Sequence, residues 1–349
     1  MESQAEKDDK ECENDLDYSE VKYPLRLFVC NWCWLVQTED YAQADEVFRA
    51  NYPYFSSISE MWLEHATRYS EMIIDRLSLD STSFVIEIAS NDGYLLKNIL
   101  AAGIPCLGIE PTDSTAHAAE KLGVSILRKF FDKPLGLYLT GKYRQADLVI
   151  GNNVYAHVPD INDFTSGLKV ILKPQGTITL EFPHLLYMIT LNQFDTVYHE
   201  HFSYFSYLTI EKIFTHHGLD LFDVEELKIH GGSFRIYIRH QENSDNHISE
   251  NVSRIKLREK KHGLDKLDSY HNFSRRVEET KYQLRQFLTK TKQSGKSIVA
   301  YGAPAKGNTL LNYCGIGTDI IDYTVDINPH KQGRFLPGTH IPIFHPEKI

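Results

Sequence analysis

Residues 84–96 read FVIEIASNDGYLL, and this stretch decides the fold of the chain. It begins as a short apolar run, becomes polar around Gly93, and ends in the helical pattern that continues as YLLKNILAAG. A buried strand, a tight turn and a helix in this order are typical of a doubly wound α/β sheet. Gly93 permits a positive φ or a close backbone approach in the turn.

The alternation of strands and helices continues beyond this stretch. Strand-like PCLGIEP, ADLVIGNNV and GTITLEFPH alternate with helical STAHAAEKLG and NDFTSGLKVILK. This order predicts a parallel sheet with helices on both faces. After the helical pattern IEKIFTHHG, residues 219–240 read as two strands around a Gly-Gly turn, which predicts a terminal β-hairpin on the sheet.

We expect four successive regions along the chain. Residues 1–48 comprise an acidic tail, disordered over residues 1–20, and a β-hairpin with a CxxC turn between Tyr23 and Gln37. Residues 49–240 form the α/β domain, and residues 241–294 form an amphipathic helical connector. Residues 295–349 begin a second, smaller Rossmann-like βαβ unit, which starts after Gly295.

Composition narrows the classes of function. The net charge of −10 disfavours nucleic-acid binding, although it permits a local basic pocket for one diphosphate. The sequence contains neither an apolar run of bilayer length nor a signal peptide, so we expect a cytoplasmic protein that is not membrane-bound. The odd number of cysteines, five, argues against a disulfide framework. We also expect the protein to be a monomer.

Polar residues follow three successive strands of the predicted sheet. Ligands bind at the carboxyl ends of strands in open α/β sheets, and a carboxylate after the second strand can accept hydrogen bonds from ribose hydroxyls. Each turn alone reads best as an ordinary strand end, but three in register favour a nucleoside-containing cofactor. The candidate cofactor residues are Glu87, Ser90, Asn91, Asp92 and Gly93, then Glu110 and Pro111, then Asn152 and Asn153.

Two classes of cofactor fit these turns. The carboxylates Glu87 and Asp92 suit a cationic sulfonium cofactor that carries an amino acid. The alternative is a nicotinamide-dependent sugar oxidoreductase or epimerase. The first turn lacks the G-x-G-x-x-G spacing that seats a pyrophosphate, and this absence favours the sulfonium cofactor.

The segment NQFDTVYHEHFSY, which follows the fifth strand, is the candidate reacting centre. If it is extended, His199 and His201 share one face and Glu200 lies opposite, whereas in a loop any of them can face a substrate. A histidine beside a carboxylate is a natural general base near neutral pH. Packing of polar and aromatic residues on the sheet is an equal alternative, and a metal site lacks a third ligand with supporting spacing.

The chain resembles the nucleotide-sugar C-methyltransferases of deoxysugar biosynthesis, in particular 3-C-methyltransferases of dTDP-4-keto-deoxysugars. The resemblance extends from about Tyr23 to Ile349. The strings that carry it are YPLRLFVCNWCWLVQ, YPYFSSISEMW, EIASNDGYLL, GIEPT, NNVYAHVPDINDF, EFPHLL, NQFDTVYHEHFSY, FDVEELKIHGGSFRIY, YGAPAKGNTLLNYCGI and VDINPHKQGRFLPGTHIPI. It implies a class I methyltransferase fold with S-adenosylmethionine as cofactor and a nucleotide-diphosphate keto-deoxysugar as substrate.

The resemblance also implies a mechanism. A C4 ketone acidifies the neighbouring C3–H of the sugar, and His201 removes this proton to give an enolate that accepts the methyl group. Glu200 and Tyr198 assist His201, and His157 and Tyr52 lie near the sugar.

The C-terminal βαβ unit is implied to bind the nucleotide diphosphate. Its strand-to-helix turn contains Gly302, where backbone N–H groups suit phosphate. Lys306 and Arg334 are candidate phosphate cations, with an ordinary surface role as the alternative, and Asp326 is a candidate ribose ligand.

The sequence departs from the family pattern in two places. The family has a zinc-binding subdomain with two CxxC pairs, but here only Cys30 and Cys33 are present, and Cys12 does not restore the first pair. Tetrahedral zinc normally takes four protein ligands, so we predict no bound metal. Family members usually continue beyond the final HPEKI, so the last domain is expected to lack its final elements, and an inactive, truncated family member is a further alternative.

Overall fold

The computed structural model describes residues 2–3, 20, 23–39, 55–243 and 247–349. The chain divides into two compact units that are interleaved along the sequence. Unit 1 contains Met1–Gln43, Leu185–Tyr204 and His262–Ile349, and unit 2 contains Ala44–His184 and Phe205–Lys261. Each unit is described by itself below.

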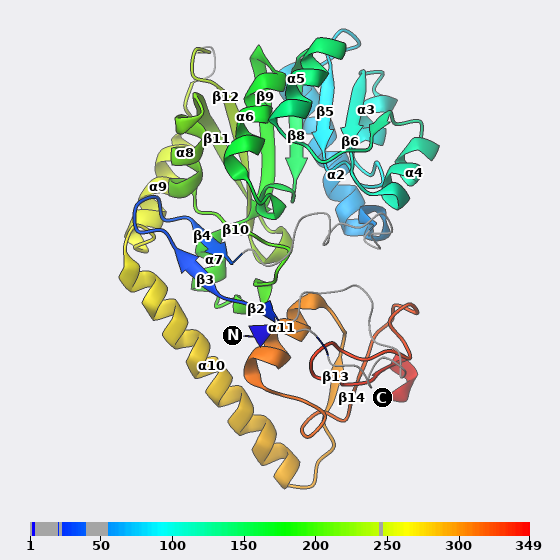
Figure 1. Cartoon of the computed structure of the whole chain (residues 1–349), viewed down its shortest axis with the longest axis vertical. Coiled ribbons are helices and arrows are strands. Elements are labelled where there is room, and N and C mark those ends of the chain that lie inside the picture. Colours follow the sequence, from blue (N-terminus) through cyan, green and yellow to red (C-terminus); the bar gives the residue numbers. More distant parts are fainter. Residues whose placement is uncertain (1, 4–19, 21–22, 40–54, 244–246) are drawn as a thin grey trace. The chain divides into compact units, whose positions relative to one another are not determined.

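Unit 2 is built on a seven-stranded mixed sheet (Figure 1). Strand β12 is antiparallel to both of its neighbours, and β9, β8, β5, β6 and β7 are parallel to one another. A parallel sheet that ends in an antiparallel hairpin is the class I methyltransferase arrangement that the sequence predicts. In spatial order the strands are β11 (Leu219–Leu227), β12 (Ser233–His240), β9 (Leu172–Pro183), β8 (Ala146–Asn152), β5 (Val85–Ile88), β6 (Cys106–Ile109) and β7 (Ile126–Leu127).

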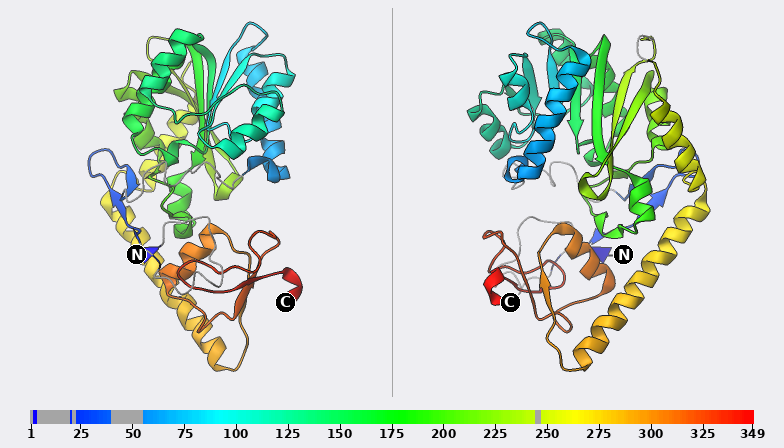
Figure 2. Two further views of the ribbon diagram at one scale, coloured as in Figure 1. Left: turned by 45° about the vertical axis from the view of Figure 1, so that its right-hand side comes forward. Right: turned by 180° about the vertical axis from the view of Figure 1, so that it is seen from behind.

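Helices cover both faces of this sheet (Figure 2). Helices α2 (Glu60–Leu77), α3 (Leu96–Ala101) and α4 (Asp113–Lys121) share one hydrophobic core with β5 and β8. On the other side α5 (Lys133–Lys142) packs on α6 (Ile161–Ile171), and α6 contacts α8 (Tyr207–His216). Helix α9 (Glu250–Lys261) packs against β11 and α8.

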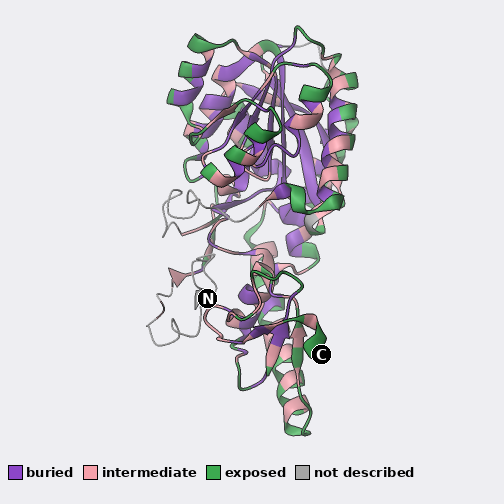
Figure 3. Ribbon diagram, turned by 90° about the vertical axis from the view of Figure 1, so that its right-hand side faces the viewer, coloured by how far each residue is buried: buried purple, intermediate pink, exposed green. Residues whose placement is uncertain are grey.

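Local sequence explains where these elements begin and why they are buried. The Ser59 hydroxyl accepts from the Trp62 N–H at the start of α2, and the Asp160 carboxylate accepts from two N–H groups at the start of α6. All four residues of β5 are buried, as expected for a strand with helices on both faces. The strands of the large sheet are mostly buried (purple in Figure 3).

Unit 1 contains the predicted CxxC hairpin. Strand β3 (Leu27–Val29) pairs with β4 (Val36–Thr38), and β10 (Ser203–Tyr204) pairs with the other edge of β4. Strands β1 (Glu2–Ser3) and β2 (Tyr23–Pro24) form a separate antiparallel pair. The prediction of disorder over residues 1–20 was therefore wrong for Glu2–Ser3, since this pairing with a distant strand leaves no periodic pattern in the sequence.

The regular elements in the rest of unit 1 are helices and a small sheet. It contains α7 (Leu185–Thr190), the long helix α10 (Leu267–Gln293) and α11 (Ala305–Cys314). Strands β13 (Val299–Tyr301), β14 (Tyr323–Val325) and β15 (Ile343–Phe344) form a parallel sheet, consistent with the predicted second βαβ unit. The predicted boundaries at residues 48, 240 and 294 treat the domains as successive segments, whereas Leu185–Tyr204 groups with the C-terminal residues.

Among the helices that the structure describes, none has the length and apolar character needed to cross a bilayer.

Gly108 in β6 provides a test of the packing beneath the first turn. A Cβ on Gly108 would overlap Ser90 Oγ and lie 2.5 Å from Ile126 Cδ1. We expect Gly108→Ala to lower the free energy of unfolding by about 1–3 kcal/mol, because overpacking a full site forces side chains off their rotamers. Urea unfolding measures this change.

Gly141→Ala is the matched control for Gly108→Ala. No atom lies within 4 Å of a Cβ at Gly141, which is near the end of α5. Alanine there should be neutral, or stabilising by up to about 1 kcal/mol. Equal effects of the two substitutions would contradict the packing described for β6.

Candidate functional site

The turn after β5 is held in an unusual backbone conformation. Ala89, Asn91 and Gly93 have φ values of 56°, 50° and 77°. A Cβ on Gly93 would lie 3.1 Å from the Cβ of Ala119, so glycine meets both the positive φ and the close approach to α4. The expected role of Gly93 in shaping this turn therefore agrees with the structure.

Glu87, on β5, is a buried carboxyl without a compensating partner. Its side chain is fully buried, and neither oxygen has a hydrogen-bond partner among the described residues. Burial, and then the nearby carboxylates of Glu110 and Asp92, raise the pKa of Glu87 well above its usual range. The described part of the fold therefore holds Glu87 as a carboxyl with no counter-charge.

Other buried polar atoms at the same strand ends are also without hydrogen-bond partners in the part of the chain that the structure describes. They are Ser90 Oγ, Asp92 Oδ1, and both side-chain polar atoms of Asn152. Buried polar groups are normally hydrogen-bonded, and a bound ligand is one source of the partners that these atoms need. Four of the residues predicted to bind cofactor (Glu87, Ser90, Asp92 and Asn152) share this property.

Glu110 follows β6 and is held firmly. One carboxylate oxygen accepts from the Asn91 N–H at 2.9 Å, and the other accepts from the N–H and the hydroxyl of Thr112 at 3.0 and 2.5 Å. The adjacent Pro111 is half-buried. These bonds fix the Glu110 carboxylate beside the first turn, and a ribose contact there remains a prediction.

The side chains of Asn91 and Asp92 have a structural function that the sequence did not predict. Asn91 Oδ1 accepts from the Ser56 N–H at 2.9 Å, and Asp92 Oδ2 accepts from the Ser57 N–H at 3.0 Å. These bonds fasten the segment before α2 to the turn after β5. Because Asn91 uses its amide oxygen in this way, its predicted contact with the cofactor is left to its other atoms.

A second buried carboxylate, Glu181 of β9, contrasts with Glu87. It accepts from His65 Nε2 at 2.8 Å and from Arg235 Nε at 2.6 Å. Burial alone would raise the pKa of Glu181, but the His65 hydrogen bond and the Arg235 charge outweigh it, so the pKa is lowered. Sequence reasoning missed this group, because its three members lie on separate elements and share no motif.

The end of β8 places two further predicted residues. Asn153 has a φ of 53°, and its N–H donates to the Glu181 carbonyl at 2.7 Å. His157 follows in the single 3₁₀ turn Tyr155–His157 and is half-buried. The structure thus brings the ends of β5, β6 and β8 together within unit 2, as parallel neighbours in one sheet.

The predicted reacting segment, in unit 1, forms a turn and not an extended strand. The His201 N–H donates to the Tyr198 carbonyl at 3.1 Å, which puts His199 and Glu200 at the two central positions of the turn. Tyr198 OH lies 3.1 Å from His201 Nε2, and the two rings are 4.2 Å apart. The alternation of faces expected for an extended stretch is therefore absent, and the Tyr198 hydroxyl contacts the His201 ring.

Contacts within unit 1 hold this turn in place. The Thr38 hydroxyl donates to the His201 carbonyl at 3.1 Å, and the Thr309 hydroxyl donates to the Val197 carbonyl at 3.0 Å. His199 Nε2 lies 3.1 Å from the Pro24 carbonyl, which assigns this ring to packing against the N-terminal strand. Tyr52, the remaining residue expected near the substrate, lies outside the described residues.

The C-terminal site is centred on Asp326, just after β14. Its carboxylate accepts from the Ala303 and Asn328 N–H groups, both at 2.8 Å, and Lys331 Nζ lies 3.5 Å away. Gly302, which comes directly before Ala303, has a φ of 93°, and this positive φ fits the predicted tight turn. Lys331 was not predicted, since only the turn after β14 folds it back toward Asp326.

Two other residues were predicted to bind substrate. Lys306 lies in α11 and Arg334 in the loop before β15, and both are half-buried. Their phosphate contacts remain predictions.

The CxxC turn offers an incomplete set of metal ligands. The Cys33 N–H donates to Cys30 Sγ at 3.5 Å, and backbone N–H groups of Cys33 and Trp32 lower the pKa of the Cys30 thiol. Within residues 2–3, 20, 23–39, 55–243 and 247–349, no three His, Cys, Asp or Glu side chains are grouped as metal ligands. Cys12 lies outside these residues, so the described part supplies two of four zinc ligands, and we assign no step to a metal.

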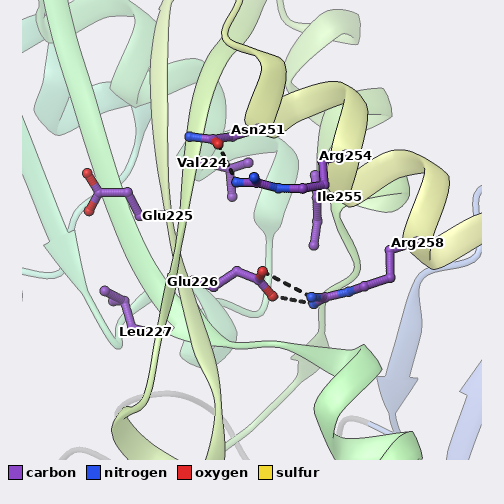
Figure 4. Close-up of a pocket in the computed structure, with 8 residues that line it drawn as sticks. All are labelled: Val224, Glu225, Glu226, Leu227, Asn251, Arg254, Ile255 and Arg258. Atoms are coloured by element: carbon purple, nitrogen blue, oxygen red, sulfur yellow. Dashed lines mark hydrogen bonds and ion pairs between the residues drawn. The ribbon is translucent and has the colours of Figure 1, made fainter.

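A separate hollow of about 410 Å³ lies between β11 and α9 (Figure 4). Among its lining residues, Arg258 pairs with Glu226, and Arg254 donates to the neutral side chain of Asn251. None of the predicted site residues lines it, so we do not assign it to the reaction.

The donor set at the strand ends fits S-adenosylmethionine. An uncompensated carboxyl at Glu87 suits a cationic ligand, and the buried polar atoms of Ser90 and Asn152 suit a ligand that also carries amino-acid and ribose groups.

Comparisons with known families cover most of the chain. A family model described as "Methyltransferase domain" matches residues 62–224, and one described as "C-methyltransferase C-terminal domain" matches residues 228–349. A third, described as "Putative zinc binding domain", matches residues 12–48. The C-methyltransferase NovU of Streptomyces niveus is 32% identical over 329 residues, which cover 94% of this chain and 78% of that protein.

Solved structures show weaker similarity. The magnesium protoporphyrin IX methyltransferase of Synechocystis PCC 6803 with bound SAH is 14% identical, with a TM-score of 0.40 over 50% of this chain and 81% of its own. A SAM-dependent methyltransferase from Anabaena variabilis is 17% identical, with a TM-score of 0.39 over 50% of this chain and 84% of its own.

Glu87→Gln tests whether the bare carboxyl serves a cationic ligand. Because the folded state raises the pKa of Glu87, it binds this proton more tightly than the unfolded chain does. Stability of the ligand-free protein therefore falls as the pH rises above the ordinary carboxyl range, and the variant should melt at a higher temperature than wild type, increasingly so at higher pH. Melting curves at several pH values measure this.

The same variant should bind S-adenosylmethionine about tenfold or more weakly, because a hydrogen bond to a charged group contributes roughly 1.5–3 kcal/mol. Glu64→Gln, at an exposed position of α2, is the control and should change neither property. An unchanged affinity together with a lower melting temperature would remove Glu87 from the cofactor site.

Proposed function

Since the chain belongs to the C-methyltransferase family and uses S-adenosylmethionine, we propose that it methylates C3 of a nucleotide-linked 4-keto-deoxysugar. Carbon is not nucleophilic until it loses a proton, so such an enzyme needs a base placed beside an acidified C–H bond. The observation that carries the proposal is the Tyr198–His201 pair: a buried imidazole oriented by a phenol in a turn fixed by several hydrogen bonds.

In the proposed reaction, His201 removes the C3 proton that the neighbouring C4 ketone acidifies. The electron pair of the broken C–H bond becomes the enolate, and the proton stays on the imidazole. S-adenosylmethionine would supply the electrophilic methyl group: its S–CH3 bond would break as the enolate carbon C3 takes the methyl, and S-adenosylhomocysteine would leave. The Tyr198 hydroxyl, 3.1 Å from Nε2, holds the ring in orientation and can exchange a proton with it.

We assign supporting roles to the remaining predicted residues. Glu200, the acidic residue of the turn, would assist His201, and His157 and Tyr52 would contact the sugar or its enolate. In unit 2, Glu87, Ser90, Asp92 and Asn152 would bind the cofactor with Glu110 and Asn153. Gly302, Lys306, Asp326 and Arg334 would bind the nucleotide diphosphate, with Lys331 as an added cation.

Family membership argues against the nicotinamide-dependent alternative, because the models that match the two main parts of the chain describe methyltransferase domains. Incubation of the protein with methyl-labelled S-adenosylmethionine and a panel of nucleotide-linked 4-keto-6-deoxysugars tests the proposal. We expect label to enter one of these sugars at a carbon. Absence of transfer to every keto sugar, with transfer to another acceptor class, would overturn it.

His201→Asn is expected to reduce methyl transfer by about 10²–10⁴-fold, the usual contribution of a positioned general base. Binding of S-adenosylmethionine should be unchanged, because the candidate cofactor residues lie on other elements. Turnover and calorimetric titration measure the two effects. His117→Asn, an exposed histidine of α4, is the control. Near-normal turnover of His201→Asn would exclude this imidazole as the base.

A further inference from the structure

Glu259, a buried carboxylate outside the proposed reaction, contacts residues at which the chain passes from one unit to the other. The chain leaves unit 2 after His184, returns to it at Phe205, and leaves it again after Lys261. The excursion Leu185–Tyr204 carries Tyr198 and His201. A contact that holds both ends of this segment therefore restrains the segment that carries the turn.

Glu259, on α9, contacts both ends of this excursion. One oxygen accepts from His184 Nε2 at 2.7 Å and from the Tyr207 N–H at 2.6 Å, and the other oxygen accepts from the Leu208 N–H at 2.9 Å. His184 is the last residue before the excursion, and Tyr207 and Leu208 follow soon after it. A single carboxylate thus joins the point of departure to the point of return.

The surroundings make this joint rigid. The side chains of Glu259 and His184 are both fully buried, so water does not compete for these hydrogen bonds. His184 and Phe205 also form a backbone bridge, and the His184 ring packs edge-on against Phe234 at 4.6 Å. A buried carboxylate with three donors is well satisfied, whereas removal of any one donor leaves it costly to keep buried.

The hydrogen bonds at the start of α8 explain why the carboxylate is needed there. The first N–H groups of a helix have no partner within the helix. Ser206 Oγ accepts from the Thr209 N–H, and Glu259 accepts from the two preceding N–H groups. The outer face of the same helix α9, with Arg254 and Arg258, borders the hollow in Figure 4. Glu259 therefore acts on the buried side of α9 only.

We propose that Glu259, with His184, is a positioning residue for the reacting turn: it fixes both ends of the excursion Leu185–Tyr204, the segment that carries His201. The inference rests on the proposed function in taking His201 as the base. Glu259 touches neither substrate nor cofactor in this account.

Glu259→Gln is the main test, because glutamine keeps the shape but replaces one accepting oxygen with an NH₂ group. We expect kcat for methyl transfer to fall at least about tenfold, since small misplacements of a reacting group are costly. The KM for S-adenosylmethionine should stay within about twofold. A loss of kcat alone separates positioning from general loss of structure.

Glu211→Gln is the matched control. Glu211 of α8 pairs with Lys256 of α9 at 2.8 Å, so this variant loosens the same two helices without touching the ends of the excursion. It should leave kcat unchanged. Equal effects of the two variants on kcat would overturn the inference.

His184 provides a second pair of variants that remains informative if Glu259→Gln does not fold. In His184→Gln the side-chain amide can still donate to Glu259, whereas His184→Leu removes the donor. We expect the glutamine variant to retain most of the wild-type kcat and the leucine variant to lose at least about tenfold. Loss of kcat in both, or in neither, would contradict the proposed joint.

Hydrogen–deuterium exchange of the ligand-free protein separates this inference from the proposed function. In Glu259→Gln or His184→Leu, amides of residues 194–204 should exchange faster, while those of β5 and β8 stay protected. Wild-type protein that methylates no keto sugar would refute the function but leave this exchange result intact. Unchanged exchange at residues 194–204 in an active enzyme would refute the inference alone.

Discussion

The candidate cofactor site depends on a contrast between two fully buried carboxyl groups of one sheet, Glu181 and Glu87. Glu181 has its counter-charge within the fold, since Arg235 and His65 donate to it and lower its pKa. Glu87, two strands away in spatial order, has no partner among the described residues, and burial raises its pKa. Burial of a bare carboxyl is costly, and we propose that a ligand with positive charge, the sulfonium cofactor, offsets this cost.

The strand end that carries Glu87 is also where the fold brings the other candidate cofactor residues together. Parallel strands β5, β6 and β8 end at one edge, and the positive φ values after β5 and β8 turn the chain sharply there. Asn91 and Asp92 also accept hydrogen bonds from the N–H groups of Ser56 and Ser57, so the turn after β5 is joined to the segment before α2. The turn Tyr198–His201 is held within unit 1 by hydrogen bonds from Thr38 and Thr309, and we propose that Glu259 fixes the two ends of its segment.

The sequence predicted what periodicity and turn chemistry determine. The order of strands and helices, the CxxC hairpin, the tight turn at Gly93 and the terminal antiparallel hairpin are all local patterns, and the structure contains them. Short β7 and helix α5 were not identified, because two residues of strand and a helix with little amphipathic pattern leave weak signals. The sequence did not decide between a turn and an extended strand at Tyr198–His201, since the conformation there follows from contacts with Thr38 and Pro24, which are distant in sequence. The bonds from Glu259 to His184 and from Asn91 to Ser56 join residues far apart in the chain, and no spacing reveals them.

Proton release on cofactor binding tests the central claim most directly. If Glu87 is held neutral in the free protein and becomes charged against the sulfonium, then binding of S-adenosylmethionine releases a proton at mildly acidic pH. Isothermal titration in buffers of different ionisation enthalpy measures this, because the observed heat then depends on the buffer. We predict net proton release that Glu87→Gln abolishes. Heats of binding that are the same in every buffer would contradict the account of Glu87 as the partner of the cofactor's charge.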